Sequence, residues 1–506
     1  MSFARRLAFL VVLTPTLLSA QTASRTATTK VGPPRGTVIV VGGGSLGPEI
    51  YAEFIKAAGG PDALIIDVPN AGGGASYGQD AAGTRGFKAA GAKNVYVLHT
   101  RDRTIADSDS FVAVIRKAGG VWFDGGRQYH LVNDYGGTKT EAAFREVLER
   151  GGVVGGSSAG ASILGDFLVR GAPSSNNRIM DYPGYQKGFA YLRNTGVDQH
   201  VVARERLPDL ADSIITKYPN MLAISEDEGT AWVIRGDTGT IVGRSKAFVY
   251  NGTQNDPGSP FLTLWPGDVY DLGARRLVRR AIEGSPLTVA FVDSMLSRYA
   301  DASRGGATLL VAHDGKVLVN KSWGIAPQAR YMPTTTVPQF DIGAMSAVFT
   351  SVCAQLPEQP AGRGTTPGRD STARPDSTPP NAAPTLTPLQ RCVSRQVGAP
   401  VGMHKTNATT EDRVMSNVDE LYRLDLGLQN PRTWRDIDSA RGWESETRNG
   451  VARLGAFAGA GGKRGAFVRV PEKKVTVILL TNDDSADAKG MANRIIDRLL
   501  SSGPAR

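Results

Sequence analysis

Short apolar runs alternate with stretches of helical periodicity through the first third of the chain. The apolar runs are rich in Val, Ile and aromatic residues and lie at 37–41 (TVIVV), 63–68 (ALIIDV), 94–99 (NVYVLH), 120–124 (GVWFD) and 152–156 (GVVGG). One predicted helix covers Pro48 to Ala58, and another opens at a capping box of Thr138 and Glu141 and ends before Gly151. Because strands alternate with helices, the pattern predicts an α/β fold with a doubly wound parallel sheet.

A serine stands where the last of these strands must turn sharply into a helix. Gly156, Ser158 and Gly160 fit the pattern G-x-S-x-G, and a new helix is expected from about Ala161. In a strand–turn–helix elbow, small neighbours allow a strained backbone at the serine, so that its hydroxyl projects from the sheet. The pattern therefore predicts Ser158 as a nucleophile, although the same letters also occur in glycine-rich loops without chemistry.

A nucleophilic serine needs a base, and the chain has few histidines. They are His99, His130, His200, His313 and His404. His200 stands out because Asp198, Gln199, Arg204 and Arg206 surround it in sequence, and such groups orient an imidazole or bind an anionic substrate. The alternative is a surface histidine at a charged strand end. With so few histidines, a His-rich metal cluster is not expected.

Three consecutive acids follow at a distance that an α/β sheet can bridge. Glu226, Asp227 and Glu228 precede the strand-like run 230–234 (TAWVI). A carboxylate that accepts the second imidazole N–H fixes the tautomer of the base and stabilises its charged form. Any of the three can fill this role from sequence alone, and three acids in a row are also typical of a solvated loop.

Five motifs in this order resemble the cyanophycinase branch of the serine peptidase family that also contains aspartyl dipeptidase. The motifs are VVGGGS near the first predicted turn, VWFDGGRQ at 121–128, GGSSAGAS at 155–162, VDQHVVARER at 197–206 and SEDEGTAWVI at 225–234. The resemblance covers roughly residues 36 to 279. It implies a sheet like that of the class I glutamine amidotransferases, with the nucleophile at a strand end.

The resemblance also implies roles for individual residues. Ser158 matches the nucleophile, His200 the general base and Glu228 the acid, so the implied reaction is acyl transfer to Ser158 followed by hydrolysis, without metal or cofactor. Backbone N–H groups of Gly125, Gly126 and Ala159 match the oxyanion hole. Substrate-contacting positions match Gln128, Asp198, Gln199, Arg204 and Arg206.

One departure from the family pattern affects the expected substrate. The pattern DQHxxxRxRxxRL has a third arginine where this chain has Asp209. A carboxylate there reverses the charge and removes a bidentate donor. We therefore expect weak cleavage of cyanophycin, a β-Asp-Arg polymer, and a gain on Asp209→Arg. An exopeptidase for short aspartyl or isoaspartyl peptides and a non-enzymatic binding protein are the alternatives.

The remaining features of this half concern its organisation and location. Residues 1–20 have a basic start, an apolar run and a small-residue cleavage site near Ala20, as in a signal peptide, so export to the periplasm or exterior is expected. Residues 21–35 are interpreted as a linker and 36–282 as the peptidase domain.

The net charge of +10 is spread without a basic block, so no nucleic-acid partner is expected, and neither is a membrane span. A homodimer remains open. The Gly42–Gly44 run lacks nucleotide-binding spacing and is interpreted as a β-to-α turn.

The second half, 287–502, resembles a truncated and degenerate serine β-lactamase or penicillin-binding-protein-like domain. Thr308 to Gly324 predicts a hairpin with Asp314-Gly315 at its turn. The expected F-x-I-x-S-x-x-K segment has Ala344 and Ala347 in place of serine and lysine. We therefore expect no lactamase chemistry there, and we expect a chain ending near Glu283 to keep the peptidase activity.

A biased segment interrupts this second half. Residues 357–388 are rich in Pro, Thr, Asp, Arg and Ala, which cannot bury a core, so disorder is predicted. Cys353 and Cys392 bracket the segment. In an exported protein they are candidates for a disulfide that closes this loop, and two free buried thiols are the alternative.

Overall fold

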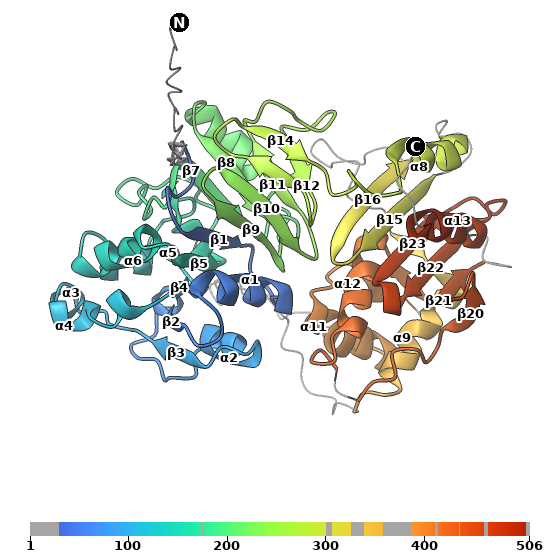
Figure 1. Cartoon of the computed structure of the whole chain (residues 1–506), viewed down its shortest axis with the longest axis horizontal. Helices are drawn as coiled ribbons and strands as arrows, with labels where there is room; N and C mark the ends of the chain where they lie inside the picture. The colour runs from blue at the N-terminus through green and yellow to red at the C-terminus, as the bar shows by residue number, and fades with distance from the viewer. Residues whose placement is uncertain are drawn as a thin grey trace, which may run out of the picture.

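The computed structural model describes residues 30–174, 176–299, 306–324, 339–357, 386–409, 413–434, 436–459 and 464–501. They form an N-terminal and a C-terminal region, each built on its own sheets (Figure 1). The predicted signal peptide and most of the predicted disordered segment lie outside the described residues. Pro388, at the end of that segment, instead begins helix α10 (Pro388–Arg391), which Thr387 caps. Among the described helices, none has the length and hydrophobicity needed to cross a membrane.

A nine-stranded sheet is the centre of the N-terminal region, with the strand order β14-β13-β10-β9-β1-β5-β4-β2-β3. Its parallel part consists of β1 (Thr37–Val41), β2 (Leu64–Val68), β3 (Asn94–Val97), β4 (Gly120–Phe123) and β5 (Val153–Ser157). Its antiparallel part adds β9 (Thr230–Arg235), β10 (Thr238–Gly243), β13 (Val269–Asp271) and β14 (Arg276–Arg279). The five apolar runs are thus confirmed as parallel strands of an α/β region, with small shifts at their ends.

Alternate residues of these strands face two separate cores. Val38 and Val40 of β1 pack in the core that contains α6 (Lys139–Glu149), whereas Ile39 and Val41 pack in the core that contains α1 (Pro48–Ala58) and α2 (Ala82–Ala89). Burial on both faces explains why the strands read as continuous apolar runs. Shorter helices α3 (Arg103–Ala106), α4 (Asp109–Val112) and α5 (Gln128–Tyr135) complete this part.

The predicted capping box at the start of α6 is wrong in its detail. Thr138 is the N-cap residue, but its side chain caps no helix amide, and its hydroxyl donates to the Tyr135 carbonyl at 2.7 Å. Glu141 accepts from the Gly137 amide at 2.7 Å, one residue earlier than the box requires. The Thr138 hydroxyl thus binds a carbonyl of the turn before the helix, and it does not cap the helix as the sequence pattern predicts.

A second sheet brings distant segments together beside the first. Its order is β12-β11-β8-β7-β6, with β6 (Gly165–Phe167), β7 (Leu192–Gln199), β8 (Leu222–Glu226), β11 (Ala247–Tyr250) and β12 (Phe261–Leu264). Strands β7 and β8 are parallel, with Gln199 opposite Glu226. Residues that follow these two strands therefore emerge side by side, which matters for the site described below.

The segment interpreted as a linker is partly packed. The amides of Lys30, Val31 and Gly32 donate to the Asp237 carboxylate at 2.7 to 2.9 Å. Val31 is 7% exposed and belongs to the core. Residues from 30 onward are thus part of the N-terminal region, because a turn carboxylate satisfies their backbone donors.

A six-stranded antiparallel sheet forms the C-terminal region, with the order β16-β15-β23-β22-β21-β20. The strands are β15 (Ala307–His313), β16 (Lys316–Trp323), β20 (Glu444–Arg448), β21 (Val451–Ala458), β22 (Gly465–Val470) and β23 (Val475–Thr481). Helices α8 (Val289–Leu296) and α13 (Ala488–Leu500) share one core with the sheet, and α9 (Ser346–Cys353) and α12 (Val418–Gln429) share the other. The predicted hairpin is confirmed, with Asp314 and Gly315 both at positive φ as this tight turn requires.

Smaller elements complete the C-terminal region. They are α11 (Ala399–Val401) and the strands β17 (Phe340–Asp341), β18 (Asn407–Ala408) and β19 (Val414–Ser416). The structure joins Cys353 and Cys392 in a disulfide, with their Cα atoms 5.9 Å apart. The bond links the end of α9 to the segment after α10, and so closes the loop that the two cysteines bracket.

Candidate active site

Ser158 lies in a sharp elbow between β5 and the short helix α7 (Ala159–Ser162). Its φ of 58° and ψ of −116° are strained for a residue with a side chain, which costs about 1–3 kcal/mol. The Ser158 amide donates to the Val41 carbonyl at 2.9 Å, which fastens the elbow to β1. A Cβ on Gly156 or Gly160 would lie 2.2 or 2.0 Å from a backbone carbonyl oxygen. The motif glycines are therefore required by close packing around the serine.

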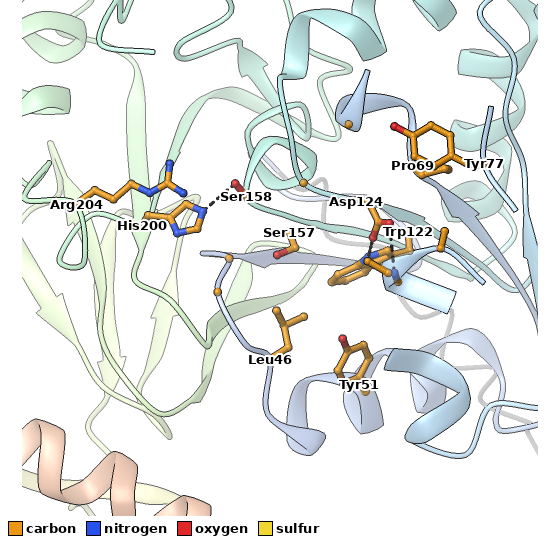
Figure 2. Close-up of a pocket in the computed structure, with 17 residues that line it drawn as sticks. Leu46, Tyr51, Pro69, Tyr77, Trp122, Asp124, Ser157, Ser158, His200 and Arg204 are labelled. Atoms are coloured by element: carbon orange, nitrogen blue, oxygen red, sulfur yellow. Dashed lines mark hydrogen bonds between the residues drawn. The ribbon is translucent and has the colours of Figure 1, made fainter. Parts of the chain in front are cut away.

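The structure brings Ser158, His200 and Glu228 together in one hydrogen-bonded chain. The Ser158 Oγ lies 2.8 Å from His200 Nε2, and His200 Nδ1 lies 2.6 Å from Glu228 Oε1. His200 follows β7 directly and Glu228 follows β8 closely, so the parallel pairing of these strands places the two residues side by side. Figure 2 shows the imidazole pointing at the serine hydroxyl. This geometry allows Ser158 to donate to Nε2 while Nδ1–H donates to the carboxylate.

The other two acids of the predicted trio lie elsewhere. Glu226 is buried at the end of β8, and burial raises the pKa of its carboxyl. Asp227 accepts from the amides of Val202 and Ala203 at 3.2 and 2.9 Å and thereby fixes the segment after His200. Of the three, Glu228 is the acid that reaches the imidazole.

The electrostatics suit a neutral base beside an ionised acid. Burial and the nearby Arg204 guanidinium lower the pKa of His200, although Glu228 acts in the opposite direction. Burial raises the pKa of Glu228, but hydrogen bonds from His200 and His404 outweigh it and hold this pKa well below its ordinary range. At neutral pH His200 is thus unprotonated and able to accept the serine proton.

The Gly42–Gly44 run lies directly against these residues. A Cβ on Gly43 would lie 2.2 Å from the His200 ring, and one on Gly44 would lie 2.5 Å from Glu228 Oε2. The His200 amide also donates to the Gly42 carbonyl at 3.1 Å. The turn interpretation of the sequence missed this role, because the glycines make room for partners that lie more than 150 residues away.

Backbone groups near the serine match the predicted oxyanion hole in position. A Cβ on Gly125 would lie 3.3 Å from Ser158 Cβ, and Ala159 follows the nucleophile directly. Among the turn and loop hydrogen bonds of the described residues, none is donated by the amides of Gly125, Gly126 or Ala159. Gly126 has a φ of 145° and packs on the Ala71 carbonyl, so it shapes the loop.

A cavity of about 480 Å³ opens beside Ser158. Arg204 lies near the nucleophile on one side, and Tyr51, Trp122 and Asp124 lie across the cavity on the other (Figure 2). Trp122 Nε1 donates to Asp124 at 3.1 Å. Behind it, burial and the Asp124 charge raise the pKa of Asp67 to about 7. The cavity thus has an arginine and a carboxylate at opposite ends, with the nucleophile between them.

The predicted substrate-contacting residues divide into two groups. Arg204 lines the cavity, whereas Gln128, Asp198, Gln199 and Arg206 are all buried. The side-chain amide of Gln128 donates to the Val169 carbonyl at 2.6 Å. The Asp198 carboxylate accepts two hydrogen bonds from the Arg170 guanidinium, both at 2.8 Å. Burial and the neighbouring Arg170 lower the pKa of Arg206 to about 10. Gln128 and Asp198 therefore support the walls of the site through internal contacts.

Asp209 has a partner that the sequence did not reveal. Its carboxylate lies 2.6 Å from Arg170, which is only 2% exposed and also binds Asp198. The carboxylate at the third-arginine position is thus neutralised by an arginine from a different segment. The expected gain on Asp209→Arg stays a prediction, and the structure adds that a new arginine there would face the Arg170 guanidinium.

A residue of the C-terminal region also reaches the site. His404 Nε2 lies 2.9 Å from Glu228 Oε2, the carboxylate oxygen that His200 does not use. Nothing in the sequence beyond the presence of a histidine indicates this contact, because neither periodicity nor motif links positions 228 and 404. No group of potential metal ligands occurs in the described part of the chain.

Comparison with known proteins identifies relatives of the N-terminal region. The sequence profile of peptidase family S51 matches residues 38–242. A cyanophycinase of Geminocystis herdmanii is 29% identical over 226 residues, which are 43% of this chain and 81% of that protein. A cyanophycinase of Synechococcus elongatus is 30% identical over 223 residues, 42% of this chain and 68% of that protein. A crystal structure of a peptidase from an acI-B1 actinobacterium aligns with 47% of this chain and 97% of its own, at 22% identity and a TM-score of 0.39.

Proposed function

The chain belongs to peptidase family S51, and from this premise we propose that it is an exported serine peptidase of the cyanophycinase type that cleaves aspartyl or isoaspartyl bonds. Membership makes the chain a peptidase and so a hydrolase, which sets aside the alternative of a non-enzymatic binding protein. The observation that carries the proposal is the hydrogen-bonded chain from Ser158 through His200 to Glu228.

The proposed reaction follows from these contacts. His200 Nε2 takes the hydroxyl proton as Ser158 Oγ attacks the substrate carbonyl, and Glu228 stabilises the imidazolium that forms. Amides of Gly125 and Ala159 stabilise the oxyanion, each contributing on the order of 3 kcal/mol. The imidazolium then protonates the leaving amine. Water, deprotonated by His200, finally attacks the acyl ester, and His200 returns this proton to the departing Ser158 Oγ, which restores both groups.

The charges in the cavity favour a bipolar substrate. Arg204 suits a substrate carboxylate, and Asp124 at the other end suits a guanidinium or ammonium group. A β-Asp-Arg unit has both groups. The same charges also fit a short aspartyl or isoaspartyl peptide with a basic residue, so an exopeptidase acting on such peptides is the second candidate.

One experiment tests both the chemistry and the substrate class. The purified chain should react with a fluorophosphonate probe at Ser158, and it should hydrolyse β-Asp-Arg dipeptide faster than β-Asp-Ala or α-Ala-Arg. Hydrolysis of polymer and dipeptide at similar rates per bond supports the cyanophycinase reading, whereas cleavage of the dipeptide alone supports the exopeptidase. Absence of labelling, or no preference for aspartyl peptides, contradicts the proposal.

We also propose finer assignments for the two regions. Helix packing on both faces of the parallel strands supports a doubly wound, amidotransferase-like peptidase fold. The antiparallel sheet flanked by α8, α13 and α9 supports a degenerate lactamase-like second region. Export is proposed from the sequence of residues 1–20, and N-terminal sequencing of the mature protein tests whether cleavage follows Ala20.

A further inference from the structure

Both carboxylate oxygens of Glu228 are bound by an imidazole. Oε1 accepts from His200 of the N-terminal region, and Oε2 accepts from His404 of the C-terminal region at 2.9 Å. The Glu228 side chain is 12% exposed, so few waters compete for these two positions. The absence of a side chain at Gly44 keeps Oε2 accessible, since a Cβ there would lie 2.5 Å from this oxygen.

The segment that carries His404 is firmly held within its own region. The amides of Lys405 and Thr406 donate to Glu420 of α12 at 3.0 and 3.2 Å. The Lys405 ammonium group also donates to the Glu205 carboxylate at 2.8 Å, across the boundary between the C-terminal and N-terminal regions. His404 is therefore presented to Glu228 from an anchored backbone, although its own side chain is 40% exposed.

The same helix fastens the backbone on either side of the triad. Arg423 of α12 is buried and donates to Asp227 Oδ2 at 2.9 Å and to Ser245 Oγ at 2.8 Å. Asp227 precedes Glu228 directly and binds the amides of Val202 and Ala203, which follow His200. The segments that carry the base and the acid thus share one carboxylate, and a C-terminal arginine neutralises it. In Figure 1, α11 and α12 form the side of the C-terminal region that faces the peptidase region.

A further ion pair crosses the boundary next to this one. Lys246 Nζ lies 2.6 Å from Asp419 Oδ2, and the lysine side chain is only 3% exposed. Arg423 also donates to the carbonyl of Gly402, two residues before His404. Arg423 therefore connects the His404 segment and the loop of Asp227 through a single guanidinium.

We propose that His404 is a positioning residue of the active site, supplied by the C-terminal region to hold the Glu228 carboxylate toward His200. This inference rests on the proposed function of the triad. A carboxylate held at both oxygens stays in the orientation that fixes the Nδ1–H tautomer of His200. A chain ending near Glu283 would lack both His404 and Arg423. If the inference holds, such a chain keeps less peptidase activity than the whole chain, whereas the sequence alone predicted that the activity is kept.

Full-chain variants of matched polarity test this inference. A glutamine at position 404 places an N–H near the location of His Nε2, whereas an asparagine is too short to reach Glu228. His404→Asn should lower kcat and the rate of fluorophosphonate labelling about tenfold, the size expected for one lost hydrogen bond to a largely buried carboxylate. KM should stay within about twofold, because His404 does not line the cavity. His404→Gln should recover most of the rate.

The controls separate positioning from folding and from the proposed function. His313→Asn changes the other histidine of the C-terminal region, at the end of β15, and should leave kcat and labelling unchanged. Equal melting temperatures of the Asn and Gln variants show that their rates differ for a local reason. Equal rates for wild type and His404→Asn, or equal losses in the Asn and Gln variants, overturn the inference. A wild-type chain that is not labelled at all overturns the proposed function, and this inference with it.

Discussion

Two serines of this chain begin helices in the two regions, and their surroundings differ in every respect that matters for chemistry. Ser158 has a strained positive φ, is partly exposed to a cavity and bonds an imidazole at 2.8 Å. Ser346 has helical dihedrals (φ −55°, ψ −23°), is 4% exposed, and its hydroxyl accepts the Val414 amide at 3.1 Å. A serine becomes a nucleophile through backbone strain, access and a base, and only the first has all three.

The largest expected effect comes from removing the first serine while keeping the second. Ser158→Ala should lower kcat by more than about 10⁴-fold, because the nucleophile and its base act as one unit. Ser346→Ala should leave kcat unchanged, and its melting temperature reports the loss of the buried bond to Val414. Steady-state hydrolysis of β-Asp-Arg measures both variants. Turnover that survives in Ser158→Ala but not in Ser346→Ala would reverse the comparison.

The acid and the base should show graded losses. His200→Ala should lower kcat to a similar extent as Ser158→Ala, and Glu228→Gln should lower it about 10²- to 10⁴-fold, since the amide no longer stabilises the imidazolium. Melting curves that match the wild type within error provide the folding control. A Glu228→Gln variant with full activity would remove this residue from the triad.

The pH dependence sharpens the assignment of the base. His200 acts in its neutral form, and its pKa lies below the ordinary 6.5 because burial and Arg204 disfavour the charged form, against the opposing effect of Glu228. Labelling should therefore be constant above this pKa and fall as the pH drops through it, with a midpoint below 6.5. Arg204→Ala removes a cation and should move the midpoint upward. A midpoint above 6.5 in the wild type would contradict the environment described for His200.

Sequence patterns predicted the parts of the molecule that local chemistry determines. The strands β1 to β5, the Asp314-Gly315 turn and the elbow around Ser158 follow from apolar runs and from glycine positions that tight turns require. The polar neighbours of His200 pointed to the base, and the resemblance to known motifs selected Glu228 from the three consecutive acids. The structure then shows the two residues in contact.

The parts that sequence patterns missed all depend on pairing between distant segments. The partner of Asp209 is the buried Arg170, which no motif connects to it, so the charge at position 209 is not the net charge of its surroundings. His404 and Arg423 reach the site because the C-terminal region packs against the N-terminal region. The periodicity of a single sequence does not predict how two such regions pack together.

A substitution at position 209 should have a smaller effect. It distinguishes the sequence-based expectation of faster polymer cleavage from the loss of stability that the Arg170–Asp209 ion pair predicts. Asp209→Arg should place a second guanidinium against Arg170 and lower stability by about 1–2 kcal/mol, less than for a fully buried pair because Asp209 is 36% exposed and Asp198 remains. Asp209→Asn is the matched control without the added cation. Denaturant unfolding measures stability, and β-Asp-Arg hydrolysis measures activity. A faster polymer cleavage by Asp209→Arg would confirm the expectation drawn from the sequence.

The last prediction concerns lactamase activity, for which we expect no signal at all from the C-terminal region. Ala344 and Ala347 replace the expected serine and lysine, and the neighbouring Ser346 hydroxyl is occupied by the Val414 amide. A hydroxyl that is buried, unstrained and without a base has no route to attack a β-lactam. The full chain should therefore hydrolyse no nitrocefin and retain no penicillin, while Ser158 in the same sample still reacts with a fluorophosphonate. A penicillin adduct that Ser346→Ala abolishes and Ser158→Ala preserves would show that the second serine is a nucleophile after all, because only a covalent bond at that hydroxyl gives this pattern.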